Sequence, residues 1–200
     1  MEIAKERIAA LQKLRDLESR LQVAPISPLE IEGFFQHPDQ YVRICAAGLV
    51  GEYRIATALE LLASALDDKC EYVADAAAVA LGRIGSKEAL ICLQTSFLSD
   101  KIARPHYLAN AISSFGRDGF EILAQVAQSP SANLRYYAAR GLGSTGIPAA
   151  EPILDKLMED REQTTFGGLV ATAAKKALKT LHRIVESEPP SKEEEATDGS

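Results

Sequence analysis

The sequence predicts an all-α protein: a right-handed α-solenoid of about five helix pairs, preceded by an N-terminal capping helix. Three observations support this prediction. A segment recurs at a nearly constant offset, apolar residues are spaced three and four apart within each segment, and glycine and proline stand at regular positions between the segments. The strict alternation of apolar and polar residues that is typical of a half-buried strand is absent.

The repeat is visible in the order of the residues. The segment VRICAAGLVGEY, which begins at Val42, returns 31 residues later at Val73 as VADAAAVALGRI. A third unit contains LANAISSFG, and a fourth begins at Leu134 with LRYYAARGLGST. The fifth, VATAAKKALKTLHRI, follows a longer connection from Thr164 to Gly168. A repeat of this length indicates stacked two-helix units that cover one another's apolar faces.

Each unit is predicted to contain two helices with defined ends. Ser27, Pro28 and Glu30 form a capping box with proline at the first helical position. Asp118 and Glu121 are also three residues apart, which is the spacing between the N-cap residue and the acid of a capping box. Glycines after the second helices are expected to adopt the left-handed conformation that ends a helix; they are Gly85, Gly116 and Gly146.

The stretch His37–Gly51, HPDQYVRICAAGLVG, resembles the HEAT-like repeat of the phycobilisome-lyase type, whose units resemble D-P-x-x-V-R-x-x-A-A-x-A-L-G-x-x-G. Leu134–Gly146 and Val73–Gly85 match the same pattern, and the resemblance covers about residues 28–184. It implies a HEAT-like superhelix. In HEAT repeats an aspartate in the turn and an arginine early in the second helix help to join neighbouring units.

Asp39 and Arg43 match the aspartate–arginine pair of HEAT repeats, and Arg135 matches with Asn133 ahead of it. In the second unit Ala74 stands at the arginine position. The resemblance therefore implies that the link between neighbouring units is present in some repeats and missing in others.

The domain organisation has three predicted segments: a capping helix over 1–24, the repeat solenoid over 25–186 and a disordered acidic tail over 187–200. An apolar stripe of Ile3, Ala10, Leu14, Leu17 and Leu21 suits a helix that packs on the first repeat. The alternative for this stripe is a coiled-coil or dimer contact through the N-terminal helix.

Charge and composition exclude several classes of function. The formal net charge is −6, and Glu186–Ser200 alone holds six acidic residues and one basic residue, so the rest of the chain is nearly neutral. The basic excess of a nucleic-acid-binding protein is missing. No apolar run is long enough for a membrane span, and the first residues lack the apolar core of a signal peptide. We therefore expect no nucleic acid, no membrane and a cytoplasmic location.

Cysteine and histidine suggest no metal site. The three cysteines, Cys45, Cys70 and Cys92, form no C-x-x-C motif and are expected to be small buried apolar residues. The three histidines, His37, His106 and His182, lie far apart in the sequence.

The segment Gly141–Gly146 satisfies G-x-G-x-x-G, but a predicted helix precedes it where a dinucleotide site needs a strand. Its glycines are expected at the repeat's own turn. The prediction is a non-enzyme with no catalytic residues, no cofactor and no metal.

Residues of equal register on the second helices are predicted to form rows on the concave face of the solenoid. The predicted partner-binding residues are Ile44, Asp75, Arg83, His106, Asn110, Tyr136 and Arg140. Tyrosine and arginine are frequent anchors of interfaces. The bland alternative is that these are solvated positions without a partner.

The leading functional hypothesis is a non-catalytic protein-binding adaptor or assembly scaffold whose partner is another protein. The resemblance implies an alternative: a bilin lyase subunit or phycobiliprotein-handling chaperone that binds a linear tetrapyrrole or attaches it to a partner's cysteine. A DNA-glycosylase-like HEAT protein is a third alternative, which the nearly neutral body and the absence of tryptophan disfavour.

Overall fold

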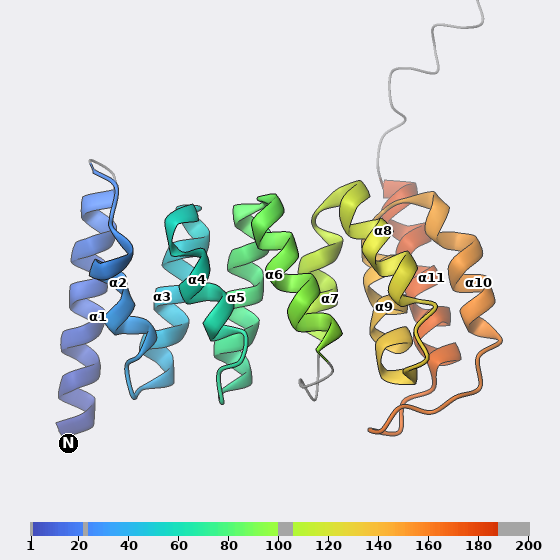
Figure 1. Cartoon of the computed structure of the whole chain (residues 1–200), viewed down its shortest axis with the longest axis horizontal. Coiled ribbons are helices and arrows are strands. Elements are labelled where there is room, and N and C mark those ends of the chain that lie inside the picture. The colour runs from blue at the N-terminus through green and yellow to red at the C-terminus, as the bar shows by residue number, and fades with distance from the viewer. Residues whose placement is uncertain (1, 22–23, 100–105, 188–200) are drawn as a thin grey trace, which may run out of the picture. The chain divides into compact units, whose positions relative to one another are not determined.

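The computed structural model describes residues 2–21, 24–99 and 106–187, and these residues form α-helices joined by short turns (Figure 1). Across these ranges the only β-pairing is an isolated bridge between Gln163 and Leu169. The predicted all-α class with five helix pairs and one additional N-terminal helix is confirmed. The chain divides into two compact units, Met1–Phe115 (unit 1) and Gly116–Ser200 (unit 2).

Unit 1 contains the N-terminal helix and three helix pairs. Its elements are α1 (Glu2–Leu21), α2 (Pro28–Phe35), α3 (Gln40–Glu52), η1 (Ala56–Ala58), α4 (Leu59–Ala65), α5 (Glu71–Ile84), α6 (Lys87–Leu98) and α7 (His106–Ser113). The first helices α2, α4 and α6 pack in sequence, and so do the second helices α3, α5 and α7 (Figure 1). Unit 1 therefore has two layers, with a core of alanine, leucine, isoleucine and valine between them.

Unit 2 contains two helix pairs. Its elements are α8 (Gly116–Val126), α9 (Ala132–Ser144), η2 (Pro148–Ala150), α10 (Glu151–Met158) and α11 (Val170–Ser187). The second helices α9 and α11 pack closely together, and α10 lies against α11. The predicted acidic tail lies outside the described residues except for Ser187, which ends α11.

The N-terminal helix packs on the first repeat. Ala10, Leu14 and Leu17 of α1 are buried, and α1 contacts α3. Arg7 of α1 donates to the carboxylate of Asp39, which caps α3 by accepting from the Tyr41 amide at 2.9 Å. This packing agrees with the capping interpretation, while a dimer contact through α1 stays a prediction.

Successive second helices approach one another closely where small residues meet. A Cβ atom at Gly51 of α3 would lie 2.6 Å from the Cα atom of Ala80 in α5. At Gly143 of α9 it would lie 2.5 Å from the carbonyl oxygen of Ala177 in α11. Gly51 and Gly143 occupy the same register position in their repeats, so the same close contact recurs in both units. Gly141 and Gly143 therefore lie inside a packed helix, and the expectation that they form a turn is wrong.

The turns after the second helices repeat one backbone conformation. Gly85, Gly116 and Gly146 have φ values of 67°, 57° and 68°, which confirms the predicted left-handed turns. In the first pair the equivalent residue is Arg54, at φ 49°. A side chain is strained in this region because Cβ approaches the neighbouring carbonyl oxygen.

A buried arginine joins each of two second helices to the following repeat. Arg43 donates from Nε and Nη2 to the Asp68 carboxylate, at 2.7 and 2.9 Å, and from Nη1 to the carbonyl oxygens of His37 and Pro38, at 2.8 and 3.1 Å. Burial would raise the pKa of Asp68, but hydrogen bonds from Arg43 and from the Cys70 amide outweigh it, so the pKa lies below its ordinary value. Asp68 therefore stays charged at neutral pH.

Unit 2 contains the same arrangement. Arg135 donates to Asp160 at 2.7 Å and to the carbonyl oxygens of Ser129 and Pro130 at 2.8 and 3.0 Å, and it also pairs with Glu162 at 3.0 Å. Both arginines bind the aspartate 25 residues further along the chain. Arg43 and Arg135 thus join neighbouring units, as the resemblance implies, while Asp39 faces α1 and binds Arg7.

Two local expectations also fail. Cys45 is exposed on α3, Cys70 is half-buried because it precedes α5 as its N-cap residue, and Cys92 is half-buried on α6. Asp118 is the third residue of α8 and therefore lies inside the helix and not at its N-cap position. Glu121 pairs with Arg117 at 3.0 Å, so the second capping box does not form. The first one does: Ser27 and Glu30 cap α2.

Replacing Arg43 by methionine tests the link between repeats. We expect the free energy of unfolding to fall by about 3 kcal/mol, because Asp68 loses its cation and two carbonyl oxygens lose their donors. Urea denaturation followed by circular dichroism measures the change. Arg83→Met, on an exposed arginine of α5, is the matched control and should change stability by less than about 0.5 kcal/mol. Equal losses in both variants would contradict the assignment.

Replacing Arg54 by glycine tests the strained turn. We expect the free energy of unfolding to rise by roughly 0.5–1 kcal/mol, since glycine adopts the left-handed conformation without a Cβ contact. The same change at Arg83, inside α5, should instead lower stability by about 1 kcal/mol. Thermal denaturation separates the two outcomes, and destabilisation by Arg54→Gly would overturn the interpretation.

Candidate functional site

The structure places the predicted partner-binding residues on the second helices of both units. Ile44 lies on α3, Asp75 and Arg83 on α5, and His106 and Asn110 on α7, all in unit 1. Tyr136 and Arg140 lie on α9 in unit 2. Exposed side chains among the seven are Asp75, Arg83, Asn110 and Arg140, whereas Ile44, His106 and Tyr136 are half-buried.

In unit 1 these residues belong to a larger surface of exposed and half-buried side chains, which we call the second-helix face. It consists of Tyr41, Ile44, Tyr72, Asp75, Val79, Arg83, His106 and Asn110. Along α5, Tyr72, Asp75 and Val79 are three and four residues apart and so share one side of the helix. The Asp75 charge also affects Tyr107 of α7. Burial raises the pKa of Tyr107 to about 12, and the negative charge of Asp75 adds to this effect.

Two tyrosines on this face are missing from the sequence-based prediction. Tyr41 is 54% exposed and Tyr72 is 64% exposed, and they stand 31 residues apart at the start of successive second helices. The repeat offset could have identified them, because they form the register row that precedes Ile44 and Asp75. Val79, at 45% exposed, lies on the same face and adds an aliphatic contact.

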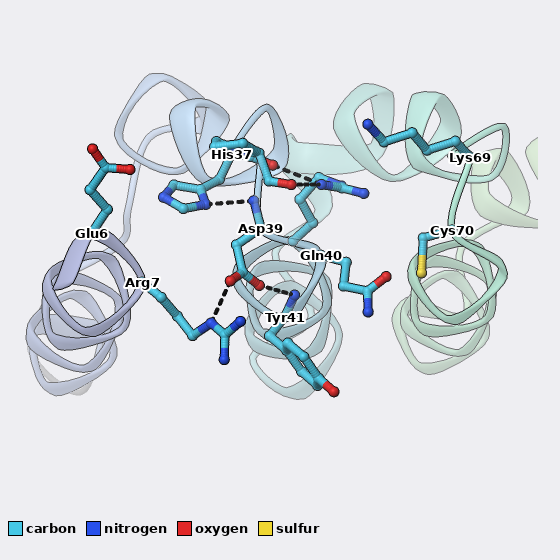
Figure 2. Close-up of a pocket in the computed structure, with 10 residues that line it drawn as sticks. Glu6, Arg7, His37, Asp39, Gln40, Tyr41, Lys69 and Cys70 are labelled. Atoms are coloured by element: carbon cyan, nitrogen blue, oxygen red, sulfur yellow. Dashed lines mark hydrogen bonds and ion pairs between the residues drawn. The ribbon is translucent and has the colours of Figure 1, made fainter. Parts of the chain in front are cut away.

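Beside Tyr41 lies a pocket of about 490 Å³ at the amino-terminal ends of α3 and α5, with α1 on one side (Figure 2). Arg7 lines it, lies over the Tyr41 ring with 5.0 Å between its Cζ atom and the ring centroid, and binds Asp39. The Asp39 amide donates to His37 Nδ1 at 3.1 Å. Burial opposes the Asp39 charge, but Arg7 and the Tyr41 amide lower the pKa of Asp39 below its ordinary value. This network fixes Arg7, and Arg7 holds the Tyr41 ring.

Lys69 and Cys70 line the far side of the same pocket, at the start of α5 (Figure 2). The pocket thus extends the second-helix face around the ends of the helices and adds the charges of Arg7 and Lys69 to it. Within residues 2–21, 24–99 and 106–187, no group of three or more histidine, cysteine, aspartate or glutamate side chains is placed to hold a metal ion. No helix in those ranges is long and apolar enough to cross a membrane.

In unit 2 the long connection before α11 folds over Tyr136. The Tyr136 ring packs edge to face against the Phe166 ring, with 5.2 Å between the ring centroids and 85° between the ring planes. Thr165 donates from its amide to Asn133 of α9 at 2.9 Å, and Thr164 and Gly168 exchange hydrogen bonds of 2.8 Å. Tyr136 therefore anchors a loop, while Phe166, 45% exposed, presents its ring to solvent.

The comparisons with known proteins agree with this architecture. Residues 28–116 match the family model for HEAT repeats, and residues 134–160 match the model for the PBS lyase HEAT-like repeat. The chain is therefore built from HEAT-like repeats in both units, which confirms the resemblance drawn from the sequence. No curated protein matches the chain.

The solved structures that are similar to the chain include the following two. One is the complex of CpcE and CpcF of phycocyanin lyase from Nostoc sp. PCC7120, with 20% identity and a TM-score of 0.49 over 80% of this chain and 66% of that one. The chain thus spans just under two thirds of that relative's length. The other is an engineered protein, with 17% identity and a TM-score of 0.43 over 88% of this chain and 92% of that one.

The packing of Tyr136 and the exposure of Tyr72 predict effects of different size for the same substitution. We expect Tyr136→Ala to lower the free energy of unfolding by about 2 kcal/mol, because it removes the contacts that hold Phe166 and Gly168 on α9. Tyr72→Ala should change it by less than about 0.5 kcal/mol, since the side chain is exposed. Thermal denaturation of both variants is the measurement, and an unchanged midpoint for Tyr136→Ala would show that the loop does not depend on it.

Proposed function

We propose that the protein is a protein-binding adaptor or assembly scaffold whose partner contacts the second-helix face of unit 1. The observation that carries the proposal is the pair of highly exposed tyrosines, Tyr41 and Tyr72, at equal register on neighbouring second helices. Leaving two aromatic rings in water is unfavourable, and tyrosine is enriched among the residues that dominate binding energy. A partner that covers both rings would relieve this exposure.

The surroundings of the tyrosines suit a protein partner. Val79 and Ile44 add apolar area, while Asp75, Arg83 and Arg7 place charges of both signs around it. An apolar centre with a charged rim is typical of protein interfaces, in which the charges select the partner and fix its orientation. The spacing of the repeat also matches an elongated partner that contacts successive helices in turn.

Arg7 contributes rigidity to this surface. Its guanidinium is held by the buried carboxylate of Asp39 and lies over the Tyr41 ring. A side chain that is already fixed loses less conformational entropy when a partner binds. Arg7 thus holds the Tyr41 ring in place, whereas the Tyr72 side chain is exposed on α5 and supplies the more adaptable of the two contacts.

The double variant Tyr41→Ala/Tyr72→Ala tests the proposal. A partner is first isolated by affinity capture from native lysate and purified, and its dissociation constant is measured by calorimetry. We expect the double variant to bind at least about 10-fold more weakly, with an unchanged thermal midpoint, because each ring is an exposed anchor.

The matched control is Ile91→Ala/Leu98→Ala, which removes two residues, 52% and 47% exposed, from α6 in the first-helix layer. This control should bind as tightly as the wild type. Equal affinities for the tyrosine variant and the wild type would refute the proposed face, and a loss confined to the α6 variant would move the interface to the first helices.

A second candidate function is that of a bilin lyase subunit or phycobiliprotein-handling chaperone. The match of residues 134–160 to the PBS lyase HEAT-like repeat favours it. In this role the chain would bind a linear tetrapyrrole or help to transfer it to a cysteine of a partner. Tyr136, Arg140 and the exposed Phe166 are the aromatic and cationic groups that unit 2 offers to such a ligand.

Phycocyanobilin itself distinguishes the two candidates. The purified chain is mixed with the free bilin, and the absorbance spectrum is recorded against the heat-denatured chain. A red-shifted band that appears only with the folded chain supports the lyase candidate. An unchanged spectrum counts against bilin binding and leaves the adaptor proposal in place.

A further inference from the structure

A pocket in unit 2, which we call the cationic pocket, is lined by four basic side chains and by no acidic one. It has a volume of about 600 Å³, and its basic residues are Lys175, Lys176 and Lys179 of α11 and Arg161 of the connection before α11. All four side chains are exposed, and none forms an ion pair within the described part of unit 2. Lys175 and Lys179 are four residues apart, and like charges at this spacing on a helix repel one another. An anionic occupant would relieve this repulsion.

The connection between α10 and α11 separates its charges onto two sides. Asp160 and Glu162, the sequence neighbours of Arg161, both pair with Arg135 of α9, at 2.7 and 3.0 Å. These two acids and Glu159 line a different pocket, which also contains Arg135. The acids next to Arg161 in the sequence are therefore bound on the α9 side, and the cationic pocket keeps its positive charge.

The amino-terminal end of α11 adds to this positive potential. Thr172 lines the pocket within the first turn of this 18-residue helix, and that turn contains no acidic residue. The aligned peptide dipoles of a helix place a partial positive charge at this end, which favours an anion nearby. The amides of Val170 and Ala171 already donate to carbonyl oxygens of the preceding connection. The donors for an anion are therefore side chains: the four basic groups and the Thr172 hydroxyl.

The cationic pocket also has an apolar wall. Met158 at the end of α10 and Leu169 before α11 line it beside the lysines, and Leu169 is 37% exposed. A small inorganic anion would leave this wall in contact with water. An occupant that carries both carboxylates and an apolar side chain would cover the wall and neutralise the basic groups together.

The surroundings of the pocket favour a protein segment over a nucleic acid or a membrane. Residues 116–187 contain nine basic and eight acidic residues, so an extended anionic surface would meet acids as well as bases. The pocket is lined by no aromatic side chain on which a base could stack. A short acidic segment, by contrast, needs to contact only the pocket itself.

We propose that the cationic pocket binds an acidic segment of a partner protein. Carboxylates of this segment pair with the three lysines of α11 and with Arg161, and one apolar side chain packs against Leu169 and Met158. The ion pairs lie at the surface, so increasing salt weakens the contact. The site lies within unit 2 and does not depend on the second-helix face of unit 1.

A short, capped, fluorophore-labelled peptide of Glu-Asp-Leu repeats tests this assignment on the full-length chain. Fluorescence anisotropy at about 50 mM salt, where screening is weak, measures its dissociation constant. We expect Lys175→Gln/Lys176→Gln/Lys179→Gln to bind the peptide at least about 10-fold more weakly, because three of the four cations are lost. The thermal midpoint should stay unchanged, since all three side chains are exposed.

Two further peptides separate the contributions of charge and apolar contact. A peptide of Gln-Asn-Leu repeats keeps the leucines without the charges, and a peptide of Glu-Asp-Ser repeats keeps the charges without the leucines. We expect both to bind more weakly than the Glu-Asp-Leu peptide. If the Glu-Asp-Ser peptide bound equally well, the apolar wall would have no part in recognition and the proposed occupant would be wrong.

The matched control removes the same charge elsewhere: Lys5→Gln/Lys13→Gln/Lys87→Gln, three exposed lysines of unit 1. This control should bind the Glu-Asp-Leu peptide as the wild type does. Equal affinities of the two triple variants, or a wild-type dissociation constant above about 1 mM, would refute the site. Tighter binding of single-stranded DNA or of phosphatidylserine vesicles, with the same dependence on the α11 lysines, would assign the pocket to a nucleic acid or a membrane instead.

Discussion

The close contact between successive second helices constrains the rest of the structure. At Gly51 a Cβ atom would lie 2.6 Å from the backbone of Ala80, and at Gly143 it would lie 2.5 Å from Ala177. Two helices can approach this closely only in one register, because a shift along the axis would place a side chain in the contact. Equal register in turn aligns Tyr41 with Tyr72 and brings the Arg43 guanidinium within reach of Asp68. The second-helix face of unit 1 therefore depends on Gly51, which it does not contain, and Gly143 sets the same close approach within unit 2.

The arginine links are local supports within this frame. Arg43 and Arg135 each bind an aspartate of the following repeat and two carbonyl oxygens of the preceding turn. In the second repeat Ala74 and Ser99 occupy the arginine and aspartate positions, and both partners are thus replaced together. Ala74 is buried there, so close apolar packing substitutes for the ion pair. A lone charged partner would be costly in the same place.

The candidate surfaces show how the surroundings of a residue decide its role. Tyr72 and Tyr136 both stand near the start of a second helix, yet Tyr72 is exposed and Tyr136 lies beneath the loop that carries Phe166. The register rows read from the repeat offset lie on the second helices, and their α5 members Asp75 and Arg83 are exposed. They could not foresee the loop before α11, because its path depends on the hydrogen bonds of Asn133, Thr164 and Gly168 across the chain.

The sequence by itself determined the helix pairs, the capping of α2 by Ser27 and the left-handed turns at Gly85, Gly116 and Gly146, because each depends on residues only a few positions apart. It also determined the uneven charge that separates α11 from the residues after it. Only the tertiary structure decided that Asp68 and not Asp39 binds Arg43, that Cys45 is exposed and that Gly143 packs inside α9. Each of these depends on which neighbouring helix contacts the residue. The sequence repeat predicts where the helices lie along the chain, but it does not specify the contacts between them.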